Sequence, residues 1–154
     1  MVIWFTGQPG SGKTTLSNEF AKKVLYSHFY LKDKIIQIDG DYLRKVLDNK
    51  DYSEQGRRKN IQFAIDMAKV MDDKGYLVLV SLVAPYRGQR EQLKMKRNII
   101  EFYLHTTKTR GKEHYFVHEY EQPLKNFTHI NTNKTIEECT DKMLHIYREM
   151  LKKQ

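Results

Sequence analysis

The sequence is poor in several features that mark particular classes of protein. It has a single cysteine, Cys139, so an internal disulfide is excluded and a reducing compartment is expected. No apolar run approaches the roughly 20 residues that a membrane-spanning helix needs, and there is no internal repeat or low-complexity tract. We therefore expect a cytoplasmic protein with no membrane contact, folded as one domain over residues 1–154.

Acidic residues are scarce relative to basic ones. Lysine and arginine total 27 against 19 aspartates and glutamates, which gives a formal net charge of +8. Such an excess suits a solvated, lysine-rich surface, and it equally suits a site for a polyanionic ligand such as a nucleotide or a nucleic acid. Charge alone favours neither interpretation, so the motifs must decide.

Apolar runs alternate with helix-like segments along the chain. Runs rich in β-branched and aromatic residues predict strands at 2–5, 35–38, 77–80, 99–104 and, more weakly, 127–130. Helical spacing covers 13–26, 55–74 and 88–97, and Thr135 with Glu138 forms a capping-box pattern before a helix that runs toward Leu151. This alternation predicts an α/β fold of three layers around a mostly parallel, five-stranded sheet. The polar segment 106–123 (the lid segment) has no secure pattern of either kind and is expected to be a short lid.

The segment GQPGSGKT, residues 7–14 (the phosphate loop), directly follows the first expected strand. It matches the pattern G-x-x-x-x-G-K-[S/T] at every fixed position and opens a helix, so an ordinary glycine turn is disfavoured. In such loops backbone N–H groups surround phosphate oxygens, the lysine contacts the β- and γ-phosphates, and the final hydroxyl binds Mg²⁺. We predict a P-loop NTPase fold that binds a nucleoside triphosphate with Mg²⁺. The residues expected to bind the cofactor are Gly7, Gln8, Pro9, Gly10, Ser11, Gly12, Lys13, Thr14 and Thr15.

Two carboxylates, Asp39 and Asp41, end the second expected strand in the sequence IIQIDGDYLR. If this strand is the neighbour of the first, both face the triphosphate, and Mg²⁺ offsets their mutual repulsion. We expect Asp39 to hold the metal together with Thr14, and Asp41 to accept a hydrogen bond from the hydroxyl that attacks the γ-phosphate. Arg44 follows one helical turn later and is expected to bind an anionic part of the acceptor. The alternative is an aspartate that caps a helix beside a solvated arginine.

At this point the chain resembles the adenylylsulfate kinase family. The matching segments are GQPGSGKTT, IDGDYLR, DYSEQGRRKNIQFAIDMAKVMDDKGYLVLVSLVAPYRGQR, YEQP and NTNKTIEEC. The resemblance implies a kinase that uses ATP and Mg²⁺ to phosphorylate the 3′-hydroxyl of adenylyl sulfate, with a parallel sheet and a mobile lid. A homodimer is compatible with the sequence.

The resemblance also implies roles for individual residues. The acceptor pocket would be lined by Arg44, Tyr52, Arg57 and Asn60. Arg87 and Arg90 would flank the acceptor and the phosphate, with Arg87 catalytic alongside Asp41 and Lys13.

The lid segment aligns only loosely with the family. In it, Arg110 and Lys112 would offset phosphate charge, with Arg110 on the ATP side, and Phe116 would stack on a base of the acceptor. The alternative is that Tyr115 and Phe116 fasten the lid segment to the core.

The sequence departs from the family at several positions. Ala84 replaces the family's serine before Pro85, so a phosphoserine there is impossible and direct in-line transfer is expected. Tyr52 replaces a phenylalanine, Gly56 replaces an aspartate, and the lid segment is shorter.

Two other functions stay open. A short lid and a charge of +8 suit a kinase that acts on a hydroxylated base or modified nucleotide in DNA. The third is a non-catalytic regulator that binds ATP, which the intact Lys13, Asp39 and Asp41 disfavour.

Overall fold

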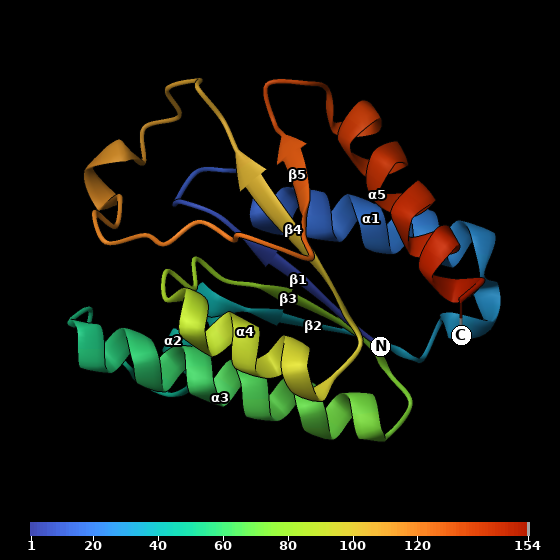
Figure 1. Cartoon of the computed structure of the whole chain (residues 1–154), viewed down its shortest axis with the longest axis horizontal. Coiled ribbons are helices and arrows are strands. Elements are labelled where there is room, and N and C mark those ends of the chain that lie inside the picture. Colours follow the sequence, from blue (N-terminus) through green and yellow to red (C-terminus); the bar gives the residue numbers. More distant parts are fainter. Residues whose placement is uncertain (154) are drawn as a thin grey trace.

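The computed structural model describes residues 1–153, and its centre is a single parallel sheet of five strands (Figure 1). The strands are β1 (Val2–Thr6), β2 (Ile35–Asp39), β3 (Leu77–Ser81), β4 (Ile99–His105) and β5 (Thr128–Asn131). They lie in the order β2-β3-β1-β4-β5, and every neighbouring pair is parallel. The predicted three-layer α/β fold is therefore confirmed.

Helices cover both faces of the sheet (Figure 1). One face carries α1 (Lys13–Ser27) and α5 (Ile136–Leu151), and the other carries α2 (Gly40–Val46), α3 (Glu54–Asp73) and α4 (Arg87–Lys96). Two short 3₁₀ turns, η1 (Phe29–Leu31) and η2 (Glu113–Tyr115), lie in the connections. In residues 1–153, no helix combines the length and the apolar character that crossing a membrane requires.

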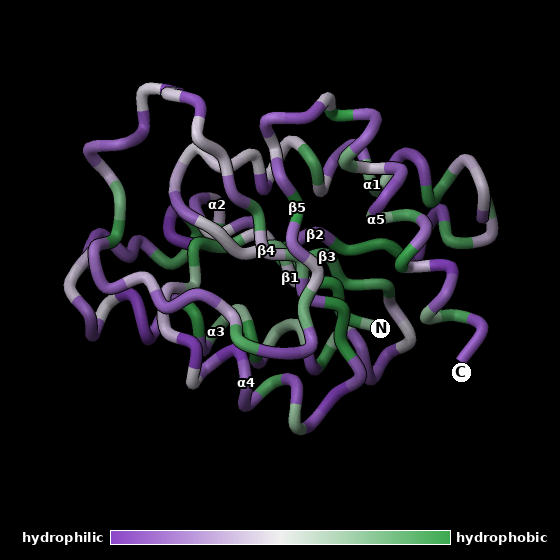
Figure 2. Tube along the Cα trace, turned by 45° about the horizontal axis from the view of Figure 1, so that its top comes forward, coloured by the Kyte–Doolittle hydropathy of each residue, from purple (hydrophilic) through white to green (hydrophobic). Residues whose placement is uncertain are grey.

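The central strand β1 shows why the strands appear in the sequence as unbroken apolar runs. All five of its residues are buried, and alternate side chains enter different cores. Ile3 and Phe5 pack with α1 and α5, whereas Val2 and Trp4 pack with the helices of the other face. A strand covered on both faces has no polar side to present. In Figure 2 the hydrophobic colour accordingly gathers on the strands at the centre.

The predicted helix signals correspond to real termini. Thr135 and Glu138 form the predicted capping box at the start of α5. On α3, Ile61, Ile65 and Ala68 lie buried on one face as their spacing indicates.

Two features of the fold differ from the expectations. The short helix α2, which begins directly after Asp39, was expected only in the alternative in which an aspartate caps a helix, and β2 is not the neighbour of β1. The strand β3 lies between them and is buried at every residue, whereas β2 is only half-buried and exposes Gln37. The more apolar strand takes the inner position because burial on both faces removes the most apolar surface from water.

Candidate active site

The phosphate loop connects β1 to α1 in a conformation that its glycines permit. Gly7 has φ of 150°, and a Cβ there would lie 2.3 Å from the carbonyl oxygen of Leu104. Gly12 caps α1 in the left-handed region, with φ of 94°. The loop thus turns tightly into a helix N-terminus, where unpaired backbone N–H groups and the helix dipole favour a bound anion.

Lys13 crosses back over the phosphate loop. Its Nζ donates to the carbonyl oxygens of Gly7 (3.0 Å) and Gln8 (2.9 Å). Burial lowers the pKa of this ammonium to about 8, although the charges of Asp41 and Asp39 raise it in part. The lysine therefore lies within electrostatic reach of both predicted carboxylates.

Asp39 contacts both the phosphate loop and α2. Its Oδ2 accepts a hydrogen bond of 2.7 Å from the Thr14 hydroxyl. Its Oδ1 accepts from the backbone N–H groups of Asp41 (3.0 Å) and Tyr42 (3.2 Å), which caps α2. Asp39 is therefore a helix cap, as the alternative interpretation expected, and the same carboxylate also contacts the phosphate loop. The contact forms even though β3 separates the two strands, because all parallel strands end at the same edge of the sheet.

The chemistry of the Thr14–Asp39 pair fits Mg²⁺. A hydroxyl and a carboxylate are hard oxygen donors, and Mg²⁺ is usually held by one or two carboxylates together with substrate phosphates and water. Residues 1–153 contain no cluster of three or more His, Cys, Asp or Glu side chains that would form a complete cage for a metal ion. The donor set is thus that of a metal bound together with a nucleotide.

A cleft of about 910 Å³ opens at this edge of the sheet. It brings together most of the residues that the sequence predicted. The predicted residues that line it are Pro9, Gly10, Gly12, Lys13, Thr14, Thr15, Asp39, Asp41, Arg44, Tyr52, Arg57, Asn60, Arg110 and Phe116. Of the other loop residues, Gly7 and Gln8 contact Lys13 through their carbonyl oxygens, and Ser11 is buried beneath the loop.

Two arginines and an aromatic ring also line the cleft. The Arg44 guanidinium lies 4.2 Å from the centroid of the Tyr52 ring, and that of Arg57 lies 5.7 Å from it. Arg44 also donates to the carbonyl oxygen of Asp51 at 2.8 Å, and Arg57 to that of Tyr52 at 2.9 Å. These contacts hold two cationic groups beside a stacking surface.

Two polar atoms in the cleft lining have no partner in the described part of the chain. Asn60 is 4% exposed and its Oδ1 accepts no hydrogen bond, and Ser81 is 5% exposed with an unpaired Oγ. Buried polar groups are rarely left unpaired, so these atoms favour a polar ligand in the cleft. Asn60 was predicted from the resemblance. Ser81 was missed, although its place at the end of β3 would have pointed to it.

The lid segment closes one side of the cleft with basic and aromatic side chains. Arg110 donates to the carbonyl oxygens of Gly10 (3.1 Å) and Thr132 (2.6 Å), which holds it beside the phosphate loop. Lys112 and Phe116 line the cleft, as do His114 and Tyr115 within the η2 turn. His114 was not predicted, because the lid segment has no periodic pattern from which a facing side can be read.

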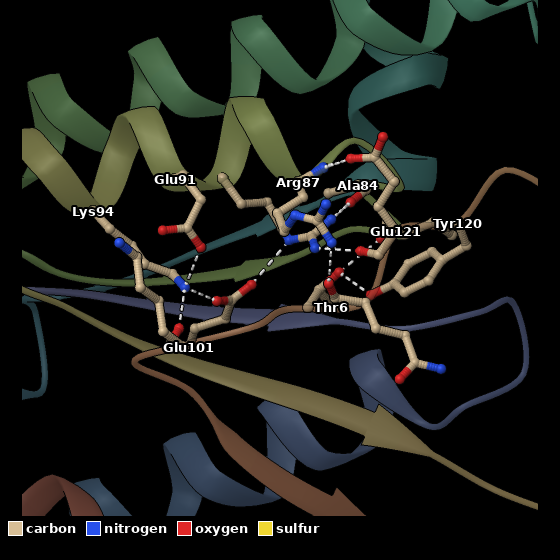
Figure 3. A network of polar contacts seen from close by, with 12 residues as sticks. Thr6, Ala84, Arg87, Glu91, Lys94, Glu101, Tyr120 and Glu121 are labelled. Atoms are coloured by element: carbon tan, nitrogen blue, oxygen red, sulfur yellow. Dashed lines mark hydrogen bonds and ion pairs between the residues drawn. The ribbon is translucent and has the colours of Figure 1, made fainter.

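Arg87 and Arg90 lie outside the cleft lining, contrary to the expectation that they contact the acceptor. Figure 3 shows Arg87 and the polar network beside it. Arg90 is 1% exposed: its Nε pairs with Glu101 Oε1 at 2.9 Å, and its terminal nitrogens donate to the carbonyl oxygens of Ala84 and Glu121. Arg87 contacts the carbonyl oxygen of Gln122 at 3.1 Å. Arg90 points inward because the buried carboxylate of Glu101 on β4 requires a cation.

Ala84 is held by this buried network in an unusual backbone conformation. It has φ of 42°, is 2% exposed and lines the cleft, while Arg90 binds its carbonyl oxygen. Left-handed φ is uncommon outside glycine and indicates a conformation fixed by its surroundings. Arg90 thus shapes the cleft indirectly, through the loop that follows β3.

The parallel sheet, the phosphate loop at the end of β1 and the paired carboxylates beside it define a P-loop protein with a nucleotide-sized cleft. The chain belongs to the adenylylsulphate kinase family, because the family model of that description matches residues 1–144.

Individual relatives agree with this assignment. The adenylyl-sulfate kinase of Buchnera aphidicola subsp. Schizaphis graminum is 36% identical over 112 residues, which are 69% of this chain and 50% of that protein. The adenylyl-sulfate kinase of Vibrio cholerae is 34% identical over 112 residues, 69% of this chain and 49% of that protein. The chain spans about half the length of the curated adenylyl-sulfate kinases that it matches.

Solved structures share the fold. The APS kinase of Mycobacterium tuberculosis in complex with AMPPNP and APS superposes with a TM-score of 0.79 at 21% identity and covers 96% of both chains. A gluconokinase from Sinorhizobium meliloti gives 0.61 at 15% identity, covering 91% of this chain and 87% of that one.

Proposed function

We propose that this protein is a Mg²⁺-dependent kinase that transfers the γ-phosphate of ATP to a hydroxyl of a nucleotide-like acceptor, with the 3′-hydroxyl of adenylyl sulfate as the leading acceptor. The observation that carries the proposal is the cleft in which Lys13, the Thr14–Asp39 pair and Asp41 meet. Membership of the adenylylsulphate kinase family supports the acceptor, as do relatives named adenylyl-sulfate kinase. These relatives give no support to DNA as the acceptor.

The residues divide into a donor side and an acceptor side. The phosphate loop, Lys13 and Arg110 would bind the triphosphate, and Thr14 with Asp39 would hold Mg²⁺, which neutralises phosphate charge when bound. On the other side, Arg44 and Arg57 would bind the anionic part of the acceptor, and a base would stack on Tyr52. The cleft lining thus provides cationic side chains for two anions, one set at the phosphate loop and the other formed by Arg44 and Arg57.

Transfer would proceed in line between these two sites. The acceptor oxygen forms a bond to the γ-phosphorus while the bond from that phosphorus to the bridging oxygen breaks, and ADP leaves with the bond electrons. Asp41 would accept the proton of the attacking hydroxyl. Ala84 has no hydroxyl, so a phosphoserine at this position is excluded. Arg90 would act on the cleft only through the loop after β3, and Arg87 only through Gln122 of the lid segment.

The first prediction concerns the reaction itself and Asp41. We expect ADP release from ATP to depend on adenylyl sulfate, and Asp41→Asn to lower kcat by about a hundredfold or more because the hydroxyl loses its base. The Kd for ATP should stay within about twofold, because the phosphate contacts are unchanged. A coupled assay for ADP measures the first quantity and calorimetry the second.

Other candidate acceptors in the same assay test whether adenylyl sulfate is the acceptor. Unmodified nucleosides and DNA with hydroxylated bases should release no ADP above background. Release with such DNA but not with adenylyl sulfate would replace the proposed acceptor, and ATP binding without release for any acceptor would contradict a kinase.

A further inference from the structure

The side chain of Gln8, within the phosphate loop, pairs with the backbone of the lid segment. Its Nε2 donates to the carbonyl oxygen of Val117 at 2.8 Å, and its Oε1 accepts from the N–H of the same residue at 2.9 Å. One side-chain amide therefore meets both polar groups of one peptide residue, as a neighbouring strand would. The two residues are 109 positions apart in the sequence.

This pair lies in the middle of the lid segment. On one side of it, Arg110 binds the carbonyl oxygen of Gly10. On the other side, the hydroxyl of Tyr120 lies 2.7 Å from that of Thr6. Between these two anchors, the hydrogen bonds that join residues 111–119 to the described chain outside the lid segment are the two to Gln8.

The residues directly before Val117 face the cleft. His114, Tyr115 and Phe116 line it, whereas Val117 itself is 4% exposed and packs inward. Their position therefore depends on where the backbone at Val117 is held. A lid that is already fastened in the free protein has less conformational entropy to lose when a ligand binds.

We propose that Gln8 is a positioning residue that fixes the 114–116 wall of the cleft by pairing with Val117. The expected effect on the KM for the acceptor rests on the proposed kinase function. The expected effect on the backbone at Val117 rests on the structure alone. Gln8 acts through the lid backbone and is not itself catalytic. The phosphate loop and the lid segment then move as one unit, so the acceptor enters a wall that is already formed.

The physical test is amide hydrogen exchange in Gln8→Met, which keeps the length of the side chain but removes both hydrogen bonds. We expect the Val117 amide to exchange about tenfold faster or more, with Tyr115 and Phe116 following, since each lost hydrogen bond contributes about that much protection. Gln92→Met, at an exposed position on α4, is the matched control and should change none of these rates. Gln8→Glu keeps the acceptor for the Val117 amide but loses the donor. Its exchange rates should therefore lie between those of the wild type and those of Gln8→Met.

The kinetic test compares the effect of the variant on the acceptor with its effect on ATP. In Gln8→Met we expect the KM for adenylyl sulfate to rise about tenfold while the Kd for ATP stays within about twofold. The phosphate loop would bind ATP through backbone N–H groups, which this substitution keeps, and Lys13 and Arg110 keep their own anchors. Unchanged exchange at Val117, or equal losses for ATP and acceptor, would overturn the role of Gln8. Inactivity of the wild type with every acceptor would overturn the proposed function only, since the exchange measurement needs no reaction.

Discussion

At the scale of single residues, Asp39 shows how one carboxylate serves structure and chemistry together. One oxygen caps α2 and the other binds Thr14, so the charge is held in place by the helix that it begins. Capping residues are common at helix starts and are usually given a structural role only. Here the second oxygen faces the phosphate loop, and the cap fixes its direction. The proposed metal site therefore depends on a residue whose local pattern is ordinary.

Lys13 gives a prediction of pH dependence at the same scale. Burial lowers its pKa to about 8, and a bound triphosphate should raise that pKa because it favours the charged form. ATP binding should therefore take up protons, with little uptake near about pH 7, where the ammonium is already charged, and more near about pH 9. The affinity for ATP should fall as the pH rises through about 8.

Calorimetry in two buffers of different ionisation enthalpy measures this proton uptake directly. Lys13→Met should bind ATP more weakly and show no uptake that grows with pH. Equal uptake in the wild type and in this variant would assign the titration to another group.

At the scale of elements, the buried ion pair of α4 and β4 fixes the loop after β3 (Figure 3). Arg90 and Lys94 both pair with Glu101, and all three side chains are almost fully buried. Arg90→Met should lower the free energy of unfolding by about 3 kcal/mol or more, because a buried carboxylate loses its main partner. Lys22→Met removes an exposed pair with Glu19 and should cost less than about 1 kcal/mol. Urea denaturation compares them, and similar small losses would show that the network is dispensable.

The start of α3 gives a second prediction at this scale. A Cβ on Gly56 would lie 2.3 Å from the carbonyl oxygen of Asp51, whereas one on Gly88 would meet no atom within 4 Å. Gly56→Ala should destabilise the fold by about 1–3 kcal/mol through this clash. Gly88→Ala should stabilise it by about 0.5–1 kcal/mol, because alanine favours the helix. Thermal unfolding decides the signs, and a stabilising Gly56→Ala would contradict the close packing.

At the scale of the whole molecule, the net charge of +8 is concentrated in part around the cleft. Five of the 27 basic residues line it, opposed by the two carboxylates Asp39 and Asp41. The five are Lys13, Arg44, Arg57, Arg110 and Lys112. A site of this charge suits two small anionic ligands. Of the remaining basic residues, Arg90 and Lys94 are buried against Glu101.

The dependence of binding on salt separates a small acceptor from a polymer. Adenylyl sulfate should bind with a logarithmic salt slope of about 2 or less, because it engages few cations. A nucleic acid would engage many phosphates and give a slope of about 5 or more. Fluorescence or calorimetric titration over a range of salt concentrations measures the slope, and a steep slope with tight DNA binding would favour the DNA alternative. The predicted homodimer stays a prediction, which light scattering on the same samples can address.

The sequence by itself determined the parallel α/β fold and the phosphate loop, since hydrophobic alternation and the motif of residues 7–14 are local patterns. It also indicated Asp39, Asp41 and Arg44, which lie within six positions of one another in the chain. Only the tertiary structure decided that β3 separates β1 from β2, that Arg90 is buried against Glu101, and that Gln8 pairs with Val117. These contacts join residues far apart in the chain, so they depend on which strands compete successfully for the buried centre of the sheet. No pattern within one segment records that competition.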